Sequence, residues 1–479
     1  MSNTTQALSR IEAILDDSSF VEIGARVTAR ATDFNMQEKK APSDGVITGY
    51  GVVNGNLVYV YSQDASVLGG TIGEMHAKKI ASLYEKAMKM GAPVIGLIDC
   101  AGLRLQEATD ALNGFGEIYK NMSLASGIIP QITAVYGECG GGLAVLAELS
   151  DFVFVEEKKA KLFVNSPNAL DGNYESKLDT SSAKFMAEAG VVDFVGDEET
   201  IANGVRQLVS MLPSNNAEGT VCTDNQDDLN RVCQDMEAEI ADPALALTDI
   251  SDDGVFVEAE YAKEMVTGFI LVDGVTVGAV ANRTALYDEN GEKAEEFAPV
   301  LTTAGAYKAA EFVTFCNAFE IPVLTLTNVK GFEATVKSER TIAKAAAKLV
   351  YAFSNADVPK VNIITGEAYG SAYVAMNSKS IGADMVYAWP QASIGMMDAS
   401  LAAKIMYADD IAASKDVTST INEKAAEYAA LQSSVDQAAA RGYVDTIINP
   451  EDTRKYVVAA FEMLFDKREV RADKKHGTV

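Results

Sequence analysis

Two stretches of the chain, Ile129–Leu143 (IPQITAVYGECGGGL) and Val358–Ala372 (VPKVNIITGEAYGSA), repeat one pattern of a proline, a short apolar run and a glycine-rich corner. Pro130 and Pro359 lie 229 residues apart. The same spacing relates Gly137 to Gly366, Glu138 to Glu367, Gly141 to Gly370, Pro93 to Pro322 and Gly102 to Gly331. Farther upstream, TGYGVVNG matches TGFILVDG with a spacing of 219 residues. A nearly constant spacing of this kind predicts two copies of one domain.

The apolar pattern between these corners predicts an α/β fold, because unbroken apolar runs suit buried strands and amphipathic stretches suit helices. The first copy is expected to contain a hairpin at Val46–Tyr61, followed by alternating helices and strands at Met75–Met90, Val94–Asp99, Glu107–Ser126, Gln131–Tyr136 and Leu143–Leu149. The second copy is expected to repeat this order with strands around Gly268–Val280, helix Ala304–Phe319, strand Val323–Asn328, helix Thr341–Asn355, strand Val361–Thr365 and a helix from Ala372.

The expected N-terminal domain spans residues 1–225, and the expected C-terminal domain spans 240–479. Residues 1–20 are predicted to include a short amphipathic helix. The polar, acidic stretch Ser214–Asp252 is predicted to be a linker with a short helix. The basic ending RADKKHGTV is expected to lie on the surface or against a partner subunit.

Composition excludes several classes of function. The formal net charge of −28 argues against nucleic acid as a partner, because its phosphates would be repelled. The five cysteines form no CxxC pair, so neither a zinc ribbon nor a disulfide framework is indicated. The sequence shows no signal-peptide pattern at its start and no apolar run of about 18 residues. A soluble, cytoplasmic protein is the expectation.

Side chains for acid–base or metal chemistry are scarce. The chain has two histidines, His76 in a predicted helix and His476 in the tail, and both are interpreted as surface residues. No phosphate-binding or dinucleotide-binding glycine motif is present, and no metal site is predicted. The carboxylates Glu107, Glu117 and Glu138 are interpreted as helix-face or turn residues.

Backbone N–H groups remain as the candidate chemistry. Gly140–Gly142 follow a predicted strand and precede a helix, and Gly370–Ala372 take the same place in the second copy. Amides at the start of a helix carry partial positive charge and can stabilise an oxyanion. A second kink follows the preceding strand in each copy, at Ala101–Gly102 and Gly331–Phe332. The glycines are equally compatible with tight turns that bind nothing.

Ala87–Met90 reads AMKM, the core of a biotin attachment sequence. Lys89 is expected in the last turn of a helix, whereas an attachment lysine needs an exposed hairpin turn. We therefore interpret Lys89 as a solvent-exposed helix residue.

Longer strings resemble the carboxyltransferase subunits of biotin-dependent acyl-CoA carboxylases and decarboxylases. They include SQDASVLGGTIGEMHAKKI (Ser62–Ile80), GAPVIGLIDCAGLRLQE (Gly91–Glu107), FCNAFEIPVLTLTNVKGF (Phe315–Phe332), VPKVNIITGEAYGSAY (Val358–Tyr373) and DKREVRADKKHG (Asp466–Gly477). The resemblance implies two tandem crotonase-like domains, each a β-β-α superhelix. The N-terminal domain would bind a short-chain acyl-CoA, and the C-terminal domain of another subunit would receive biotin from a separate carrier protein.

The resemblance also assigns residues to roles. Gly141 and Gly142 would stabilise the thioester enolate, and Ser371 and Ala372 would hold the biotin carbonyl oxygen. The expected acyl-CoA-binding residues are Gly102, Leu103, Arg104 and Gly140, and the expected biotin-binding residues are Gly331, Phe332, Tyr373 and Val374. No metal is required. The expected assembly is a homodimer or a trimer of dimers that meets a biotin carboxyl carrier protein and either a membrane decarboxylase subunit or a biotin carboxylase.

Several positions depart from the family pattern. Serine stands at 371, and Asp398 and Leu401 stand where the family has glycines. Asp398 could place an acid near the biotin path. Three alternatives stay open beside a sodium-pumping acyl-CoA decarboxylase: a carboxylase subunit for acetyl- or propionyl-CoA, a catalytically impaired paralogue that keeps the assembly role, and a crotonase-type hydratase or hydrolase.

Overall fold

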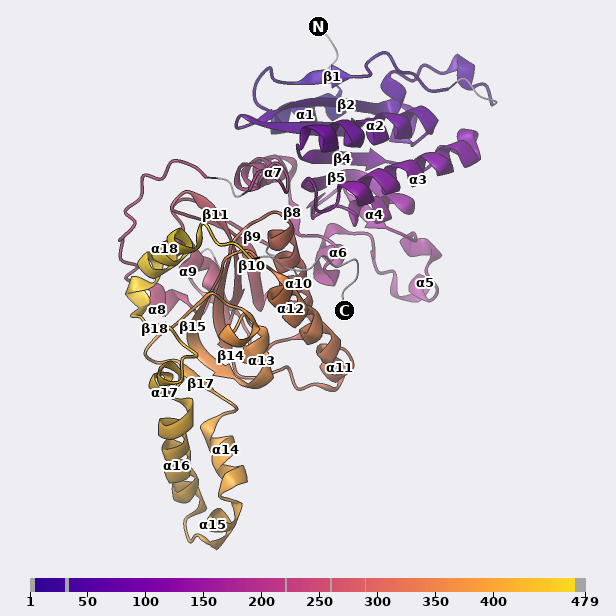
Figure 1. The fold of residues 1–479 in the computed structure, drawn as a ribbon. Coiled ribbons are helices and arrows are strands. Elements are labelled where there is room, and N and C mark those ends of the chain that lie inside the picture. The colour runs from indigo at the N-terminus through magenta and orange to yellow at the C-terminus, as the bar shows by residue number, and fades with distance from the viewer. Residues whose placement is uncertain (1–4, 31–33, 220–221, 259–260, 289, 470–479) are drawn as a thin grey trace. The chain divides into compact units, whose positions relative to one another are not determined.

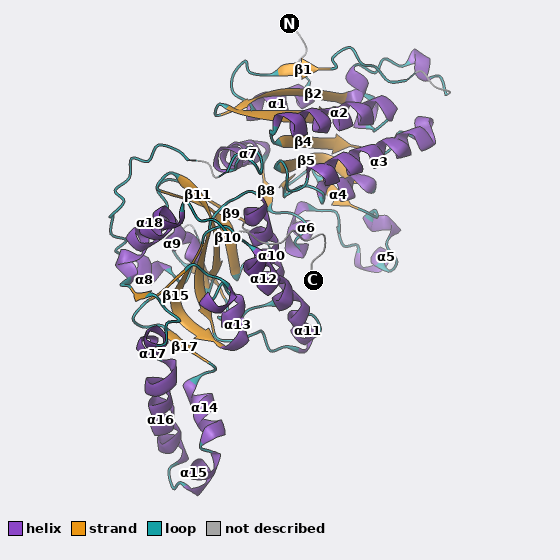
Figure 2. Ribbon diagram, viewed as in Figure 1, coloured by secondary structure: helices purple, strands orange, loops and turns teal. Residues whose placement is uncertain are grey.

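The computed structural model describes residues 5–30, 34–219, 222–258, 261–288 and 290–469. His476 and the basic ending lie outside the described residues. The chain divides into two compact units, Met1–Gly219 with Glu258–Tyr261, and Thr220–Val257 with Ala262–Val479. Figure 1 labels the elements of each unit, and Figure 2 shows the mixture of helices and strands that confirms the predicted α/β class.

The first unit is built on a mixed sheet. Its first three strands pair antiparallel, and the strands that follow pair parallel. Its order is β1-β2-β3-β4-β5-β6-β8, and β7 pairs with the far end of β5. The antiparallel hairpin of β2 and β3 was predicted, and β3 to β6 are parallel neighbours. The strands are β1 (Val21–Ile23), β2 (Val46–Val53), β3 (Asn56–Gln63), β4 (Val94–Cys100), β5 (Gln131–Gly140), β6 (Phe152–Glu156), β7 (Lys161–Phe163) and β8 (Phe194–Gly196).

The sheet of the second unit has the same connectivity, in the order β9-β10-β11-β14-β15-β16-β18, with β17 paired to β15. Its strands are β9 (Val255–Glu258), β10 (Met265–Val272), β11 (Val275–Asn282), β14 (Val323–Val329), β15 (Lys360–Tyr369), β16 (Met385–Ala388), β17 (Ser393–Gly395) and β18 (Thr446–Ile447). A separate hairpin joins β12 (Ala285–Tyr287) to β13 (Lys293–Glu296). Identical strand order in both sheets confirms the duplication inferred from the 229-residue spacing.

Backbone details repeat with the strands. The bridge between Ile72 and Leu103 corresponds to the bridge between Leu301 and Phe332. Gly91, which ends α2 in a left-handed conformation (φ 61°), corresponds to Glu320 (φ 57°). The two copies therefore share turn geometry even where the residue type has changed.

Helices cover the sheets of both units. The first unit contains α1 (Gln6–Ile14), α2 (Glu74–Met90), α3 (Ala108–Ala125), α4 (Gly142–Ala147), α5 (Asn173–Ser176), α6 (Ala183–Ala189) and α7 (Glu198–Met211). The second contains α8 (Met236–Glu239), α9 (Pro243–Ile250), α10 (Thr303–Ala318), α11 (Val336–Glu339), α12 (Ile342–Asn355), α13 (Gly370–Ala375), α14 (Ala399–Met406), α15 (Ala408–Ala413), α16 (Val417–Tyr428), α17 (Val435–Ala440) and α18 (Thr453–Leu464). In Figure 1, α14, α15 and α16 extend away from the sheet of the second unit.

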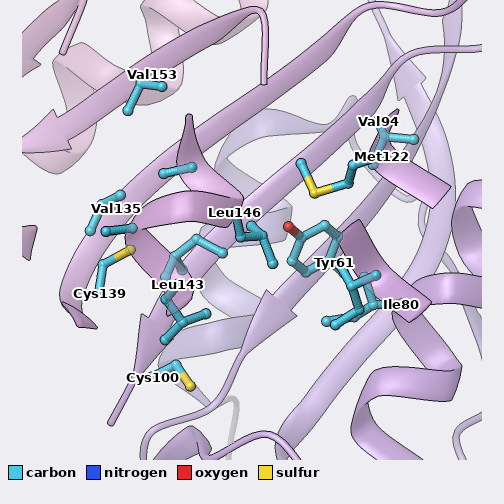
Figure 3. Packing of buried hydrophobic residues seen from close by; sticks show 14 of the residues in the cluster. Tyr61, Ile80, Val94, Cys100, Met122, Val135, Cys139, Leu143, Leu146 and Val153 are labelled. Carbon is cyan, nitrogen blue, oxygen red and sulfur yellow. The ribbon is translucent and has the colours of Figure 1, made fainter. Parts of the chain in front are cut away.

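The core of the first unit joins α4 to the strands that carry the corners. Leu143 and Leu146 of α4 are fully buried, in the same cluster as Cys100 at the end of β4 and Cys139 near the end of β5 (Figure 3). Burying a leucine side chain contributes roughly 1.5–3 kcal/mol. These contacts fix the start of α4 against the ends of β4 and β5.

The predicted linker is only partly a linker. Cys233, Met236, Leu247 and Ile250 are buried in the core of the second unit, so α8 and α9 belong to that unit. The acidic composition hid this, because apolar residues on only one face of two short helices are enough to bury them.

No helix in the described part of the chain combines the length and apolar character that crossing a bilayer requires. Among the same described residues, no group of three histidine, cysteine, aspartate or glutamate side chains is arranged to hold a metal ion.

Candidate active site

The first glycine corner joins β5 to α4, and its three glycines serve different purposes. Gly141 has φ 66° and ψ −125°, a conformation that residues with a Cβ rarely adopt. A Cβ on Gly141 would meet no atom within 4 Å, so this residue borders open space. A Cβ on Gly140 would lie 2.7 Å from the ring of Phe163, and one on Gly142 would lie 2.7 Å from the hydroxyl of Tyr119. Close packing therefore restricts positions 140 and 142.

The N–H groups of this corner differ in their partners. Gly141 N–H donates to the carbonyl oxygen of Phe163 in β7, with N and O 2.8 Å apart. This bond corrects the expectation that Gly141 N–H is free for a ligand. The N–H groups of Gly142 and Leu143 precede the first intrahelical bond of α4. Within the residues that the structure describes, neither has an acceptor.

The neighbouring kink follows β4. Gly102 has φ 105°, and a Cβ on it would meet no atom within 4 Å. Its carbonyl oxygen accepts from Ile72 N–H at 3.0 Å, and Ala101 N–H donates to the carbonyl of Gly69 at 3.0 Å. Leu103 is half-buried and packs against the core. The space beside Gly102 is therefore open, as expected of a loop that binds a ligand. The acyl-CoA-binding roles of Gly102 and Leu103 stay predictions.

Arg104 does not offer its guanidinium to a ligand. Its side chain is 1% exposed and donates to Asp44 at 2.5 Å, to Glu107 at 2.9 Å and to the carbonyl of Thr71 at 2.7 Å. The guanidinium is therefore engaged within the protein, and the acyl-CoA-binding role expected for Arg104 stays a prediction. Two buried carboxylates need a cation beside them, because an unpaired charge in the interior is costly.

The same two carboxylates cap the start of α2. Glu107 accepts from Glu74 N–H at 2.6 Å, and Asp44 accepts from His76 N–H at 2.8 Å. Burial raises the pKa of Asp44, and Arg104 opposes that shift. A Cβ on Gly73 would lie 2.4 Å from the Arg104 guanidinium, so glycine is required where α2 begins. Glu107 ends the short 3-10 helix Leu105–Glu107 that precedes α3, and it is buried.

His76 is fully buried, which overturns its interpretation as a surface residue. Its Nδ1 lies 2.9 Å from the carbonyl oxygen of Asp44, and its Nε2 lies 3.2 Å from Nε2 of Gln63. Burial lowers the pKa of His76 to about 3, and the positive charges of Arg104 and Lys79 add to that effect. His76 is therefore a neutral structural residue at physiological pH.

This burial predicts a pH dependence of stability. Between pH 6.5 and 3 the unfolded chain binds a proton at His76 that the folded chain does not, so stability is lost as the pH falls. From pH 7.5 to 5.0 we expect wild type to lose about 2 kcal/mol more unfolding free energy than His76→Gln. Denaturant unfolding of both proteins at the two pH values measures this difference. Equal losses would show that His76 is protonated in the folded protein.

The second glycine corner joins β15 to α13. Gly370 has φ 62°, and Ser371 and Ala372 occupy the first turn of α13. Over the described ranges, no acceptor is found for the N–H group of Ser371 or of Ala372. The Ser371 side chain is exposed, whereas Ala372 is 1% exposed. The amides expected from the sequence are thus free, and a hydroxyl accompanies one of them.

The kink after β14 resembles the kink after β4. Gly331 has φ 156° and open space around a notional Cβ. Its carbonyl oxygen accepts from Leu301 N–H at 2.9 Å, and Phe332 is half-buried. Tyr373 and Val374 follow in α13, and burial raises the pKa of Tyr373 to about 12, so its hydroxyl stays protonated. These four residues keep the biotin-binding role as a prediction.

Two of the departures from the family pattern, Asp398 and Leu401, lie at the start of α14. Asp398 caps this helix by accepting from Leu401 N–H at 3.1 Å, and Leu401 is 50% exposed. The carboxylate therefore has a local structural role, and its place near biotin stays a prediction. Lys89 is exposed in the last turn of α2, where a biotin attachment lysine would not lie.

Sequence reasoning missed Tyr119, Phe163 and the pair of Asp44 and Glu107. Tyr119 and Phe163 are 23 and 22 residues from their partners Gly142 and Gly141. One sign was available in the sequence: Phe115 and Tyr119 are four residues apart on a predicted helix, so both were expected on one face.

Comparison with known proteins identifies the family of the chain. Residues 2–479 match the sequence model of a protein family described as the carboxyl transferase domain. Methylmalonyl-CoA decarboxylase subunit alpha of Propionigenium modestum is 39% identical, covering 99% of this chain and 92% of the relative. The carboxyltransferase subunit of propionyl-CoA carboxylase from Haloferax mediterranei is 38% identical, covering 99% and 93%.

A solved structure shows the same fold. The transcarboxylase 12S structure described as a hexamer with methylmalonyl-coenzyme A and methylmalonic acid bound matches with a TM-score of 0.91. It is 34% identical, and the match covers 100% of this chain and 92% of that one. The crotonase-like fold expected from the sequence is therefore confirmed. The chain is a carboxyltransferase and belongs to the carboxyl transferase family, together with subunits of propionyl-CoA carboxylases and methylmalonyl-CoA decarboxylases.

Proposed function

We propose that the protein moves a carboxyl group between a short-chain acyl-CoA and biotin on a separate carrier protein, as the decarboxylase-type subunit of a sodium-pumping acyl-CoA decarboxylase. The observation that carries the proposal is the pair of glycine corners in a chain related to methylmalonyl-CoA decarboxylase. Each corner has two consecutive N–H groups for which the described residues supply no acceptor. Each corner suits one oxygen that becomes negatively charged during carboxyl transfer.

The first corner would serve the acyl-CoA. N–H groups of Gly142 and Leu143 would donate to the thioester oxygen and would stabilise the enolate that forms when the carboxyl group leaves or arrives. Gly141 would shape the loop so that the thioester reaches these donors, and open space at Gly102 would admit the acyl-CoA. No side-chain base is required of the chain at this oxygen.

The second corner would serve biotin, whose ureido group supplies the atom that carries the carboxyl group. N–H groups of Ser371 and Ala372 would hold the ureido oxygen, with Tyr373 and Val374 beside them. Open space at Gly331 fits the approach of a planar ring system, because a Cβ there would occupy it. Phe332 would offer an apolar surface to that ring.

The direction of transfer is a separate part of the proposal. The string GSAYVAMNSKSIGAD at Gly370–Asp384 resembles the decarboxylases, although carboxylase subunits are almost equally similar over the whole chain. We propose a homodimer or a trimer of dimers, since the related transcarboxylase 12S is described as a hexamer assembly. The exposed Ser371 side chain beside its amide favours a second candidate, an impaired paralogue that keeps the assembly role.

The test is decarboxylation by the purified full-length protein. Malonyl-, methylmalonyl- and glutaconyl-CoA are each mixed with free biotin, and loss of the acidic thioester is followed by chromatography. We expect biotin-dependent loss of at least one thioester. The absence of turnover with all three, also with a biotinylated carrier domain present, would overturn the proposal and favour the paralogue.

A further inference from the structure

The hydroxyl of Tyr119 touches the backbone of the first glycine corner. Tyr119 lies in α3, and its Oη donates to the carbonyl oxygen of Gly142 with the two oxygens 2.5 Å apart. Its ring packs against Phe115, one turn earlier in α3, with ring centroids 5.7 Å apart. Partial burial raises the pKa of Tyr119, so the hydroxyl is protonated at neutral pH and can donate.

The bond acts on a peptide group that carries a free N–H. The Gly142 carbonyl and the Leu143 N–H belong to one planar peptide group, so fixing the direction of the carbonyl also fixes that of the N–H. Leu143 N–H is one of the two donors without an acceptor at this corner, within the described residues. The Leu143 side chain is fully buried in the core of the first unit, which anchors this residue.

We infer that Tyr119 is a positioning residue for carboxyl transfer: its hydroxyl orients the Gly142–Leu143 peptide so that the Leu143 N–H points at the thioester oxygen. This inference rests on the proposed function. Tyr119 does not need to touch the substrate, and it gives up no proton. Tyr119 contributes by orienting the Leu143 N–H, because a donor stabilises an enolate oxygen only when it points at the place where the charge develops.

A purely structural role would look different. Removing one hydrogen bond of this kind would lower stability slightly, and the rings of Phe115 and Tyr119 would still pack without the hydroxyl. The hydroxyl lies in an exposed setting, so its removal leaves no cavity inside the protein. A stability effect alone would leave turnover per folded molecule unchanged.

The test compares wild type with Tyr119→Phe in the full chain, using the thioester on which wild type is most active. We expect kcat to fall about ten-fold to a hundred-fold, with KM for the thioester within two-fold of wild type. The shape of the pH profile of kcat should not change, since no proton is exchanged at Tyr119. Tyr443→Phe, at a tyrosine that is 56% exposed, is the matched control and should keep wild-type kcat.

The outcomes separate the inference from the proposed function. Inactive wild type would overturn the proposed function, and with it the premise for Tyr119. Active wild type with an equally active Tyr119→Phe would overturn the inference alone. A raised KM with unchanged kcat would assign Tyr119 to ground-state binding and would also contradict it. Thermal unfolding of each variant verifies that the folded fractions being compared are equal.

Discussion

Replacing Gly142 with proline should lower the turnover of carboxyl transfer about a hundred-fold or more while the protein keeps its assembly state. Proline has no N–H, so the variant lacks one of the two donors proposed for the thioester oxygen. The first position of a helix tolerates proline, so α4 should still begin at residue 142. Turnover is measured by thioester decarboxylation, and assembly by sedimentation velocity.

A matched control separates the lost donor from added bulk. Any side chain at 142 approaches the Tyr119 hydroxyl to 2.7 Å, so the variants are compared in a Tyr119→Phe background. There, Gly142→Ala keeps the N–H and should retain most of the background activity, whereas Gly142→Pro should not. Equal losses for alanine and proline would show that crowding explains the effect, and the oxyanion role of Gly142 would be rejected.

Replacing Arg104 with methionine should destabilise the first unit by about 3–5 kcal/mol. Methionine fills a similar volume but leaves Asp44 and Glu107 buried without their cation, and each carboxylate side chain is 0% exposed. Denaturant unfolding of the full chain should show an earlier transition. If Arg104 instead bound acyl-CoA, the variant would keep its stability and lose substrate affinity.

Two controls accompany this variant. Adding Asp44→Asn and Glu107→Gln removes the stranded charges, so the triple variant should recover much of the lost stability. Lys78→Met breaks an ion pair with Glu74 whose lysine is 50% exposed, and it should cost less than about 1 kcal/mol. A similar cost for Arg104→Met and Lys78→Met would contradict the buried network as a source of stability.

Local pattern predicted most of the elements. The helix expected at Met75–Met90 is α2 at Glu74–Met90, ending at Gly91 as its composition indicated. The apolar run VIGLID at Val94–Asp99 forms most of β4, which is buried along nearly its whole length. The local pattern did not predict the burial of His76. Whether a histidine in a helix faces solvent depends on its tertiary contacts, here with Asp44 and Gln63, and the residues around it in the sequence do not determine those contacts.

The sequence by itself determined a duplicated α/β chain with glycine corners after two strands in each copy, because repeat spacing, apolar runs and glycines can be read along the chain. The carboxyltransferase family was indicated by the resemblance of longer strings, such as Gly91–Glu107 and Val358–Tyr373, to known members. Only the tertiary structure decided which amides of those corners are free. The carbonyl oxygen of Phe163 accepts from Gly141 N–H, and the Tyr119 hydroxyl donates to the carbonyl oxygen of Gly142. Arg104 is paired in the interior with Asp44, 60 residues away, and with Glu107, three residues away. Hydrogen bonds are short-range and directional, so a donor's availability depends on partners that folding brings to within about 3 Å.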